Sequence, residues 1–186
     1  MEEATITETS ELTLLPFSDP MLRKVPEDFD FEKEDPKELK EKLLEKMRDL
    51  GGVGLSANQV GIDRKVFVIG DDNTAEPFNK AFFNMELVGA SEEEESMREG
   101  CLSFPGLWLM VKRPTHCAIK YFNEEGKEMV ETYQGVTARV IMHEYDHMLG
   151  LNFTMRVSKM KLERALKALE KKVKKYQRQQ TNQSNL

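Results

Sequence analysis

The sequence contains little cysteine and no long apolar segment. Two of its 186 residues are cysteine, Cys101 and Cys117, and one is tryptophan. No apolar run approaches the roughly 20 residues that a membrane-spanning helix needs. The first twelve residues, MEEATITETSEL, lack the basic start and apolar core of a signal peptide. We therefore expect a cytoplasmic protein, or the mature form of one imported into an organelle, whose cysteines are a metal ligand and a buried thiol rather than a disulfide.

Acidic residues outnumber basic ones, but the excess is uneven along the chain. The sequence has 27 Lys and Arg against 33 Asp and Glu, a net charge of −6. Residues 159–186 carry nine basic and two acidic side chains, a charge of +7, which leaves −13 for residues 1–158. A basic segment on an acidic body predicts an anionic partner for that segment, with nucleic acid the first candidate. The alternative is a solvated helix face rich in lysine.

Turn residues and apolar periodicity predict the first helix and a set of strands. Asp35 and Pro36 are typical of a helix start, and Gly51-Gly52 is typical of its end. A loop is expected at 52–61, and polar turns at 71–79 and 91–95. Strands are expected at 65–69, 82–88, 107–112, 115–122 and 128–133, and the last three are expected to be antiparallel.

Two more helices are expected. One begins between residues 134 and 138, and the other runs from about 158 to 177. The second has an apolar stripe of about two heptads for packing against the body or a partner, formed by Leu162, Leu166, Leu169, Val173 and Tyr176. The expected fold is α+β, with antiparallel sheets packed around a central helix and one helix on either side of it in sequence. The expected divisions are a disordered extension (1–11), one domain (12–157), a basic helix (158–178) and a disordered tail (179–186).

The central helix carries the pattern His-Glu-x-x-His. His143 and His147 are four residues apart, so on a helix both imidazoles lie on one face and can bind a single metal ion. Glu144 follows the first histidine and would lie beside the open coordination position, where it can move a proton of water. The alternative for this motif alone is a helix whose histidines and glutamate are merely solvated.

Two routes to a third metal ligand are open. Glu163 or Glu170, on the last predicted helix, would complete the two-histidine, one-glutamate site of metalloproteases. Cys101 would instead supply a thiolate from the loop EGCLS. It is favoured because it is one of only two cysteines and lies in a loop, whereas the two glutamates lie in a lysine-rich segment that looks exposed. His116 is a weaker candidate because it falls in a predicted strand, and Cys117 is expected to be a buried small apolar residue.

Three stretches together resemble the peptide deformylase family. They are GVGLSANQ at Gly52–Gln59, EGCLS at Glu99–Ser103 and HEYDH at His143–His147, in the family's order and approximate spacing, and the resemblance extends over residues 12–155. The sequence departs from many members in having Ser56 in place of alanine, Met85 after Asn84 where proline is common, and Trp108 in place of arginine. These differences concern substrate preference rather than chemistry.

The resemblance implies a role for each matching residue. Cys101, His143 and His147 would bind the metal, and Glu144 would be the general acid/base. The side-chain amide of Gln59 and the backbone N–H of Leu102 would form the oxyanion hole, Gly54 would bind the peptide backbone, and an Arg113–Asp146 pair would orient the helix. The methionine pocket would be lined by Val53, Met97, Trp108, Val140 and the face of His143.

The implied reaction is hydrolysis of the N-formyl group from the formyl-methionine of new polypeptides, which releases formate. A hydroxide generated at the metal would attack the formyl carbonyl. The resemblance implies Fe²⁺ as the native ion, with Zn²⁺, Ni²⁺ or Co²⁺ as substitutes, and it implies that the basic C-terminal helix docks on the ribosome. Because the sequence has no membrane-spanning apolar run and no nucleic-acid-binding motif outside this helix, we expect no membrane or DNA partner. The rival hypotheses are a metallopeptidase with a glutamate ligand and a non-enzymatic module with a structural metal site.

Overall fold

The computed structural model describes residues 12–71 and 78–183. The predicted disorder of residues 1–11 and 184–186, and most of the predicted turn at 71–79, lie outside the described residues. Within them the α-helices are α1 (Pro36–Asp49), α2 (Gly135–Met148) and α3 (Lys159–Gln183), and the short 3-10 helices are η1 (Pro20–Arg23), η2 (Ala57–Val60) and η3 (Phe153–Arg156). The strands are β1 (Gly54–Ser56), β2 (Val66–Asp71), β3 (Phe78–Ala90), β4 (Glu94–Glu99), β5 (Leu109–Pro114), β6 (His116–Phe122) and β7 (Glu128–Gln134).

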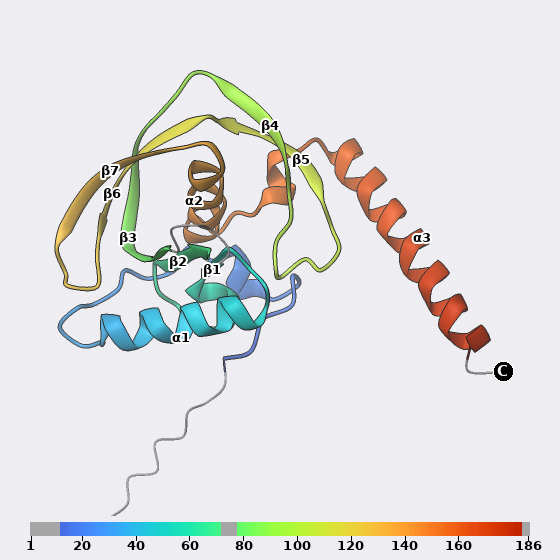
Figure 1. Ribbon diagram of the computed structural model, residues 1–186, viewed down its shortest axis with the longest axis horizontal. Coiled ribbons are helices and arrows are strands. Elements are labelled where there is room, and N and C mark those ends of the chain that lie inside the picture. Colours follow the sequence, from blue (N-terminus) through green and yellow to red (C-terminus); the bar gives the residue numbers. More distant parts are fainter. Residues whose placement is uncertain (1–11, 72–77, 184–186) are drawn as a thin grey trace, which may run out of the picture.

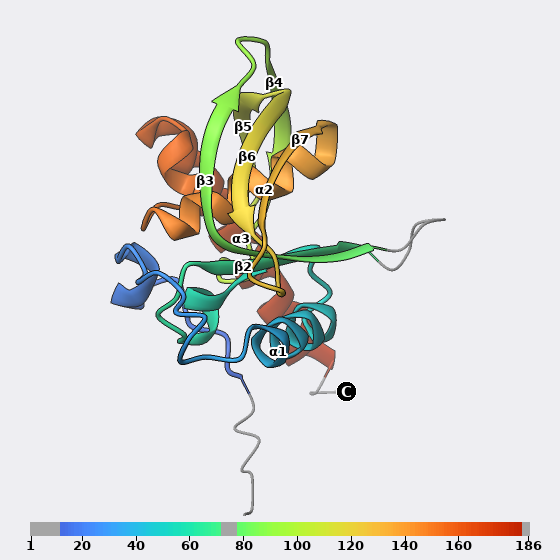
Figure 2. The same ribbon diagram turned by 90° about the vertical axis from the view of Figure 1, so that its left-hand side faces the viewer.

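The described strands form two antiparallel sheets. The larger sheet has the order β1-β2-β3-β6-β7, and the smaller one pairs β4 with β5. Helix α2 lies centrally between them, α1 lies beyond β1 and β2, and α3 extends away from the body (Figure 1). Figure 2 shows the strands β3 and β6 curving alongside α2. The predicted α+β fold with antiparallel sheets around a central helix is therefore confirmed.

Helix α1 begins and ends where the sequence predicts. The Asp35 carboxylate accepts hydrogen bonds from the backbone N–H groups of Lys37 (2.9 Å) and Glu38 (3.1 Å), which have no partner within the helix. Pro36 occupies the first turn, where a missing N–H costs nothing. The helix buries Leu43, Leu44 and Met47, so its apolar face packs on β1 and β2 and supports the segment that follows it.

Three local predictions were wrong. The segment predicted as a loop at 52–61 contains β1 and η2, and the acidic turn predicted at 91–95 runs into the strand β4. The strand β5 pairs with β4 rather than with β6. The acidic sequence concealed β4 because an edge strand can expose charged side chains to water on one face and still form its backbone hydrogen bonds.

The C-terminal helix is longer than predicted and only its first part packs on the body. Helix α3 continues to Gln183, so residues 179–183 are helical rather than disordered. Leu162, Ala165 and Leu169 pack on a small apolar cluster of β5 and η3, whereas Leu166, Val173 and Tyr176 are exposed. No described helix combines the length and apolar character that crossing a membrane requires.

Candidate active site

The central helix α2 is buried on more than one side because it lies between the two sheets. Ala138, Ile141, Met142 and Met148 pack in the apolar cluster under the larger sheet. The polar side chains of His143, Glu144 and His147 are buried as well. A helix with charged residues on a buried face must provide partners for them. The contacts of these three residues therefore define the site.

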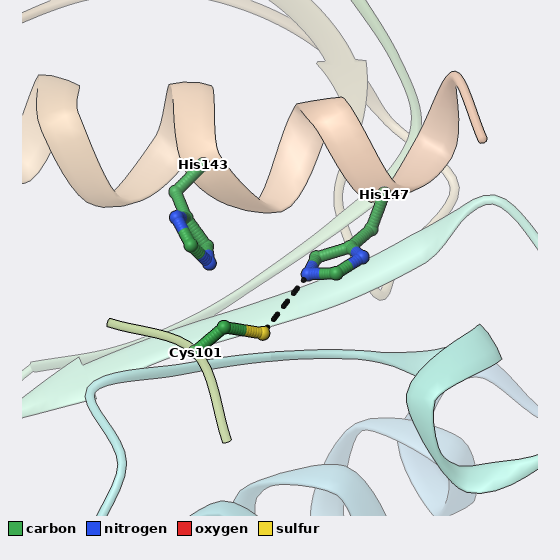
Figure 3. Close-up of side chains that lie close together, drawn as sticks. All are labelled: Cys101, His143 and His147. Carbon is green, nitrogen blue, oxygen red and sulfur yellow. Dashed lines mark hydrogen bonds between the residues drawn. The ribbon is translucent and has the colours of Figure 1, made fainter. Parts of the chain in front are cut away.

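The structure brings Cys101 to the two histidines. One possible ligand atom from each of Cys101, His143 and His147 lies within 4.8 Å of the others, and Cys101 Sγ is 3.4 Å from His147 Nε2. Figure 3 shows both imidazoles directed from α2 toward the loop that carries the thiol. One thiolate and two imidazoles suit Zn²⁺ or Fe²⁺ by ligand softness, so the donor set fits the implied metal.

The other sequence candidates for a third ligand lie elsewhere. Glu163 and Glu170 are exposed on α3, and Glu170 pairs with Lys174 along the same helix. His116 is exposed and hydrogen-bonded to Thr115 and Gln134. Cys117 is fully buried, and burial raises the pKa of its thiol to about 11. The geometry thus favours Cys101 over the metalloprotease arrangement.

The two histidines have pKa values displaced in opposite directions. Burial opposes a charge on His143, but the Cys101 thiol and the Glu99 and Glu144 carboxylates outweigh it and raise the pKa to about 10. Burial and the positive charges of His143 and Arg113 lower the pKa of His147 to about 3. Two imidazoles that face one small space are not both protonated to the positively charged imidazolium.

Glu144 is held between two residues of β1. Ser56 Oγ donates a hydrogen bond to Glu144 Oε2 at 2.7 Å. A Cβ atom on Gly54 would lie 2.6 Å from Glu144 Oε1, so a residue with a side chain at position 54 would displace the carboxylate. Burial raises the pKa of Glu144, against the opposing effects of His143 and the Ser56 hydrogen bond. A raised pKa suits a group that must both accept and return a proton near neutral pH.

Gln59 directs its amide nitrogen toward the Cys101 loop. Its Oε1 accepts a hydrogen bond from the backbone N–H of Ser56 at 3.0 Å. Its Nε2 consequently faces Ser103 Oγ at 3.1 Å and Cys101 Sγ at 3.3 Å. Leu102 follows Cys101 in a turn closed by the hydrogen bond from Phe104 N–H to Cys101 O, 2.9 Å. The two predicted oxyanion donors are thus carried by segments that meet at the thiol.

A buried ion network behind His143 includes two residues that the sequence analysis missed. Glu99 accepts hydrogen bonds from Arg113 Nε (2.7 Å) and Nη2 (2.9 Å) and from Arg139 Nη1 (2.9 Å), and its Oε2 lies 3.0 Å from His143 Nδ1. Burial would raise the pKa of Glu99, but these partners hold it well below its usual range. The i, i+4 spacing of Arg139 and His143 was a signal that both lie on one helix face.

The predicted Arg113–Asp146 pair is confirmed. Arg113 Nη1 donates to Asp146 Oδ2 at 2.9 Å, and both side chains are almost fully buried. The pair is therefore part of the interior rather than an ordinary surface ion pair. Because Arg113 bridges Glu99 and Asp146, it ties the strand β4 to the helix that carries both histidines.

Four of the predicted methionine-pocket residues are at least partly accessible, whereas the fifth, His143, is buried. Val53 and Trp108 are 51% and 52% exposed, and Met97 and Val140 are half-buried. The Trp108 ring lies against Gly100, where an added Cβ would be 3.0 Å from the ring, and the Arg98 guanidinium lies over the ring at 4.6 Å from its centroid. Trp108 is thus next to the residue that precedes Cys101. For Val53, Met97, Trp108 and Val140 the pocket role stays a prediction.

Comparisons with known proteins agree with this geometry. The model of the polypeptide deformylase family matches residues 12–163. A peptide deformylase of Cytophaga hutchinsonii is 38% identical over 152 residues, which are 80% of this chain and 83% of that one. A plant peptide deformylase structure superposes with a TM-score of 0.80 at 30% identity, covering 91% of this chain and 93% of that one. The structure of a peptide deformylase of Synechococcus elongatus, solved with actinonin, superposes with a TM-score of 0.78 at 31% identity, covering 84% of this chain and 86% of that one. The chain therefore belongs to the polypeptide deformylase family.

Proposed function

We propose that the chain removes the N-formyl group from the formyl-methionine of newly made polypeptides and releases formate, as a metal-dependent hydrolase. The observation that carries this proposal is the joint placement of a thiol, two imidazoles and a buried carboxylate at one point between the sheets. The reaction belongs in the cytoplasm, or in an organelle that starts its own polypeptides with formyl-methionine. We expect no membrane or DNA partner.

Cys101 Sγ and one ring nitrogen of each of His143 and His147 would hold the metal. When bound, a divalent ion supplies Lewis-acid chemistry, because it lowers the pKa of a water from 15.7 to about 7 and polarises a carbonyl. Fe²⁺ is our proposed native ion, and Zn²⁺, Ni²⁺ or Co²⁺ could replace it. Glu99 accepts from His143 Nδ1, which leaves Nε2 free to face Cys101 and orients the ring.

Glu144 is the group that moves protons. An amide is a poor electrophile with a poor leaving group, so hydrolysis needs a base for the attacking water and an acid for the departing amine. Glu144 takes a proton from the water and returns it to the amine. Glu99, the buried carboxylate that contacts His143, cannot do this, because two arginines bind it and keep its pKa low.

Gln59 and Leu102 stabilise the negative charge that develops on the formyl oxygen. The Gln59 amide is held in one orientation by Ser56 N–H, so its Nε2 donor is positioned before the substrate arrives. A donor that needs no reorganisation stabilises the transition state more than the ground state.

We predict that Gln59→Ala lowers kcat for formate release by roughly 10²–10³-fold with little change in KM. The physical reason is the loss of a donor that acts mainly in the transition state. Steady-state kinetics on formyl-Met-Ala-Ser, with metal content measured on the same sample, provide the test. A raised KM at unchanged kcat would show that Gln59 binds substrate without serving as an oxyanion donor.

The substrate would lie along the strand β1 next to the site. Gly54 would bind the peptide backbone, and Val53, Met97, Trp108, Val140 and the face of His143 would enclose the methionine side chain. Recognition through backbone hydrogen bonds at a strand tolerates varied side chains beyond the first residue. This suits an enzyme that must accept many different new polypeptides.

Formate release from formyl-Met-Ala-Ser by anaerobically purified protein is the direct test of the proposed function. Metal content should be read on the same sample, and the unformylated peptide serves as the control substrate. We expect formate from the first peptide and no cleavage of the second. A folded, metal-loaded protein that releases no formate would overturn the proposal.

The basic helix α3 is our proposed ribosome contact. Beyond Glu170 it exposes a lysine-rich surface formed by Lys171, Lys174, Lys175 and Arg178. Such a surface attracts the phosphates of ribosomal RNA. The first part of α3 has a different role, because Leu162 and Leu169 cover the apolar cluster under β5.

We predict that truncation after Glu170 preserves formate release but weakens ribosome binding by about tenfold or more at low salt. A cut after Val157 would be less informative because it also removes Leu162 and Leu169 from the core. Sedimentation with ribosomes at two salt concentrations gives the measurement. A full-length variant with the same basic residues changed to glutamine separates charge from helix length. Equal ribosome affinity for all three proteins would contradict the prediction.

A further inference from the structure

We propose that Ser56 is a positioning residue that holds the Glu144 carboxylate in its working orientation. Its backbone also fixes the Gln59 amide, so one residue of β1 orients both side chains. This inference rests on the proposed function, in which Glu144 moves the protons and Gln59 stabilises the oxyanion. It assigns to Ser56 a role that its place in the GVGLSANQ stretch does not by itself indicate.

The hydroxyl of Ser56 has one main acceptor. Its Oγ lies 2.7 Å from Glu144 Oε2 and 3.3 Å from the backbone carbonyl oxygen of Glu144. A hydroxyl has a single proton to donate, and the shorter distance and the charge of the carboxylate direct that proton to Oε2. Ser56 is fully buried, so bulk water does not compete for the bond. The hydroxyl can therefore select one orientation of the Glu144 carboxylate.

The geometry of β1 places Gly54 on the other oxygen of the same carboxylate. Residues two apart on a strand face the same side, so Gly54 and Ser56 both face α2. Gly54 approaches Oε1 so closely that a Cβ would lie 2.6 Å away, while Ser56 binds Oε2. The carboxylate is thus confined from both ends. Without the Ser56 donor, it would be free to rotate away from the direction in which it exchanges a proton.

The backbone of Ser56 links this carboxylate to the oxyanion donor. Ser56 N–H donates to Gln59 Oε1 at 3.0 Å, and Gln59 Nε2 faces Cys101 Sγ at 3.3 Å. A substitution of the Ser56 side chain leaves this backbone hydrogen bond in place. It does remove the acceptor that the Ser56 side chain offers to the backbone N–H of Gln59 in the capping box of η2, so metal content, KM and melting temperature are measured beside kcat.

Ser56→Ala is the first variant to examine. We expect kcat for formate release to fall about tenfold, because a hydrogen bond to a charged group is lost where it orients the proton-transfer group. KM and metal content should stay within about twofold of the wild type, since the hydroxyl donates to Glu144 and is not one of the three proposed metal ligands. Ser91→Ala is the matched control, because Ser91 Oγ also makes hydrogen bonds, with Glu93 and His116, but in the turn between β3 and β4.

The same substitution made in a Glu144→Asp background shows whether Ser56 acts through Glu144. The shorter side chain withdraws the carboxylate from the hydroxyl, so Ser56→Ala should then change kcat by less than about twofold. An equal loss in both backgrounds, or a lower melting temperature with unchanged kcat, would overturn the positioning role. Absence of formate release by the wild-type protein would instead overturn the proposed function, and this inference with it.

Discussion

Replacement of Glu144 by alanine is expected to lower kcat for formate release by roughly 10³–10⁴-fold while the protein keeps its metal. The side chain is buried beside the two histidines, and its raised pKa suits proton exchange near neutral pH. Among the described residues, Glu99 cannot replace Glu144 as the acid and base, since its carboxylate is bound by Arg113 and Arg139. The measurement is single-turnover and steady-state formate release together with metal content.

Glu144→Gln is the matched control for this experiment. Glutamine keeps the size of the side chain and can still accept the Ser56 hydrogen bond, but it cannot exchange a proton. We therefore expect it to be nearly as inactive as Glu144→Ala, with less change in thermal stability. Substantial activity in Glu144→Gln would mean that the carboxylate acts by its shape and hydrogen bonding rather than as an acid and base.

Cys101→Ala is expected to weaken metal binding by more than about 100-fold and to abolish formate release in parallel. Two imidazoles would remain from the three-donor cluster, and neither Glu163 nor Glu170 is near enough on the exposed face of α3 to complete it. Metal affinity can be measured by competition with a chelator at several concentrations. This readout does not depend on activity.

Cys117→Ala is the control for Cys101→Ala, because it removes a thiol that is not a proposed metal ligand. Cys117 is fully buried in the cluster under the larger sheet, and its raised pKa keeps it a neutral thiol. Its replacement should lower thermal stability but leave metal affinity unchanged. Full metal binding and activity in Cys101→Ala would favour the metallopeptidase arrangement, with a carboxylate as the third ligand.

The rival of a structural metal site fits the geometry less well. Such a site is closed by four protein ligands, whereas the cluster found among the described residues has three. It also gives no reason to bury a carboxylate between Gly54 and Ser56, where its charge is costly. A three-donor cluster with an adjacent buried carboxylate is typical of a catalytic site.

The sequence alone predicted the elements that depend on residues close together in the chain, such as the start of α1 and the histidine face of α2. The Asp35 cap and Pro36 marked the start of α1, and the four-residue spacing of His143 and His147 placed both on one face of α2. The resemblance carried by three short motifs predicted that Cys101 would join them. Each of these signals depends on neighbours in sequence or on a motif of a few residues.

The tertiary structure alone decided the contacts between segments far apart in the chain. The acidic stretch forms the strand β4 because it pairs with β5. Glu99, at the end of β4, contacts Arg139 and His143, which lie 40 and 44 residues further along the chain. Ser56 donates a hydrogen bond to Glu144, which lies 88 residues away in the sequence. Composition and periodicity describe how a segment folds, but not which buried charge will find a partner, because that depends on how the sheets pack around α2.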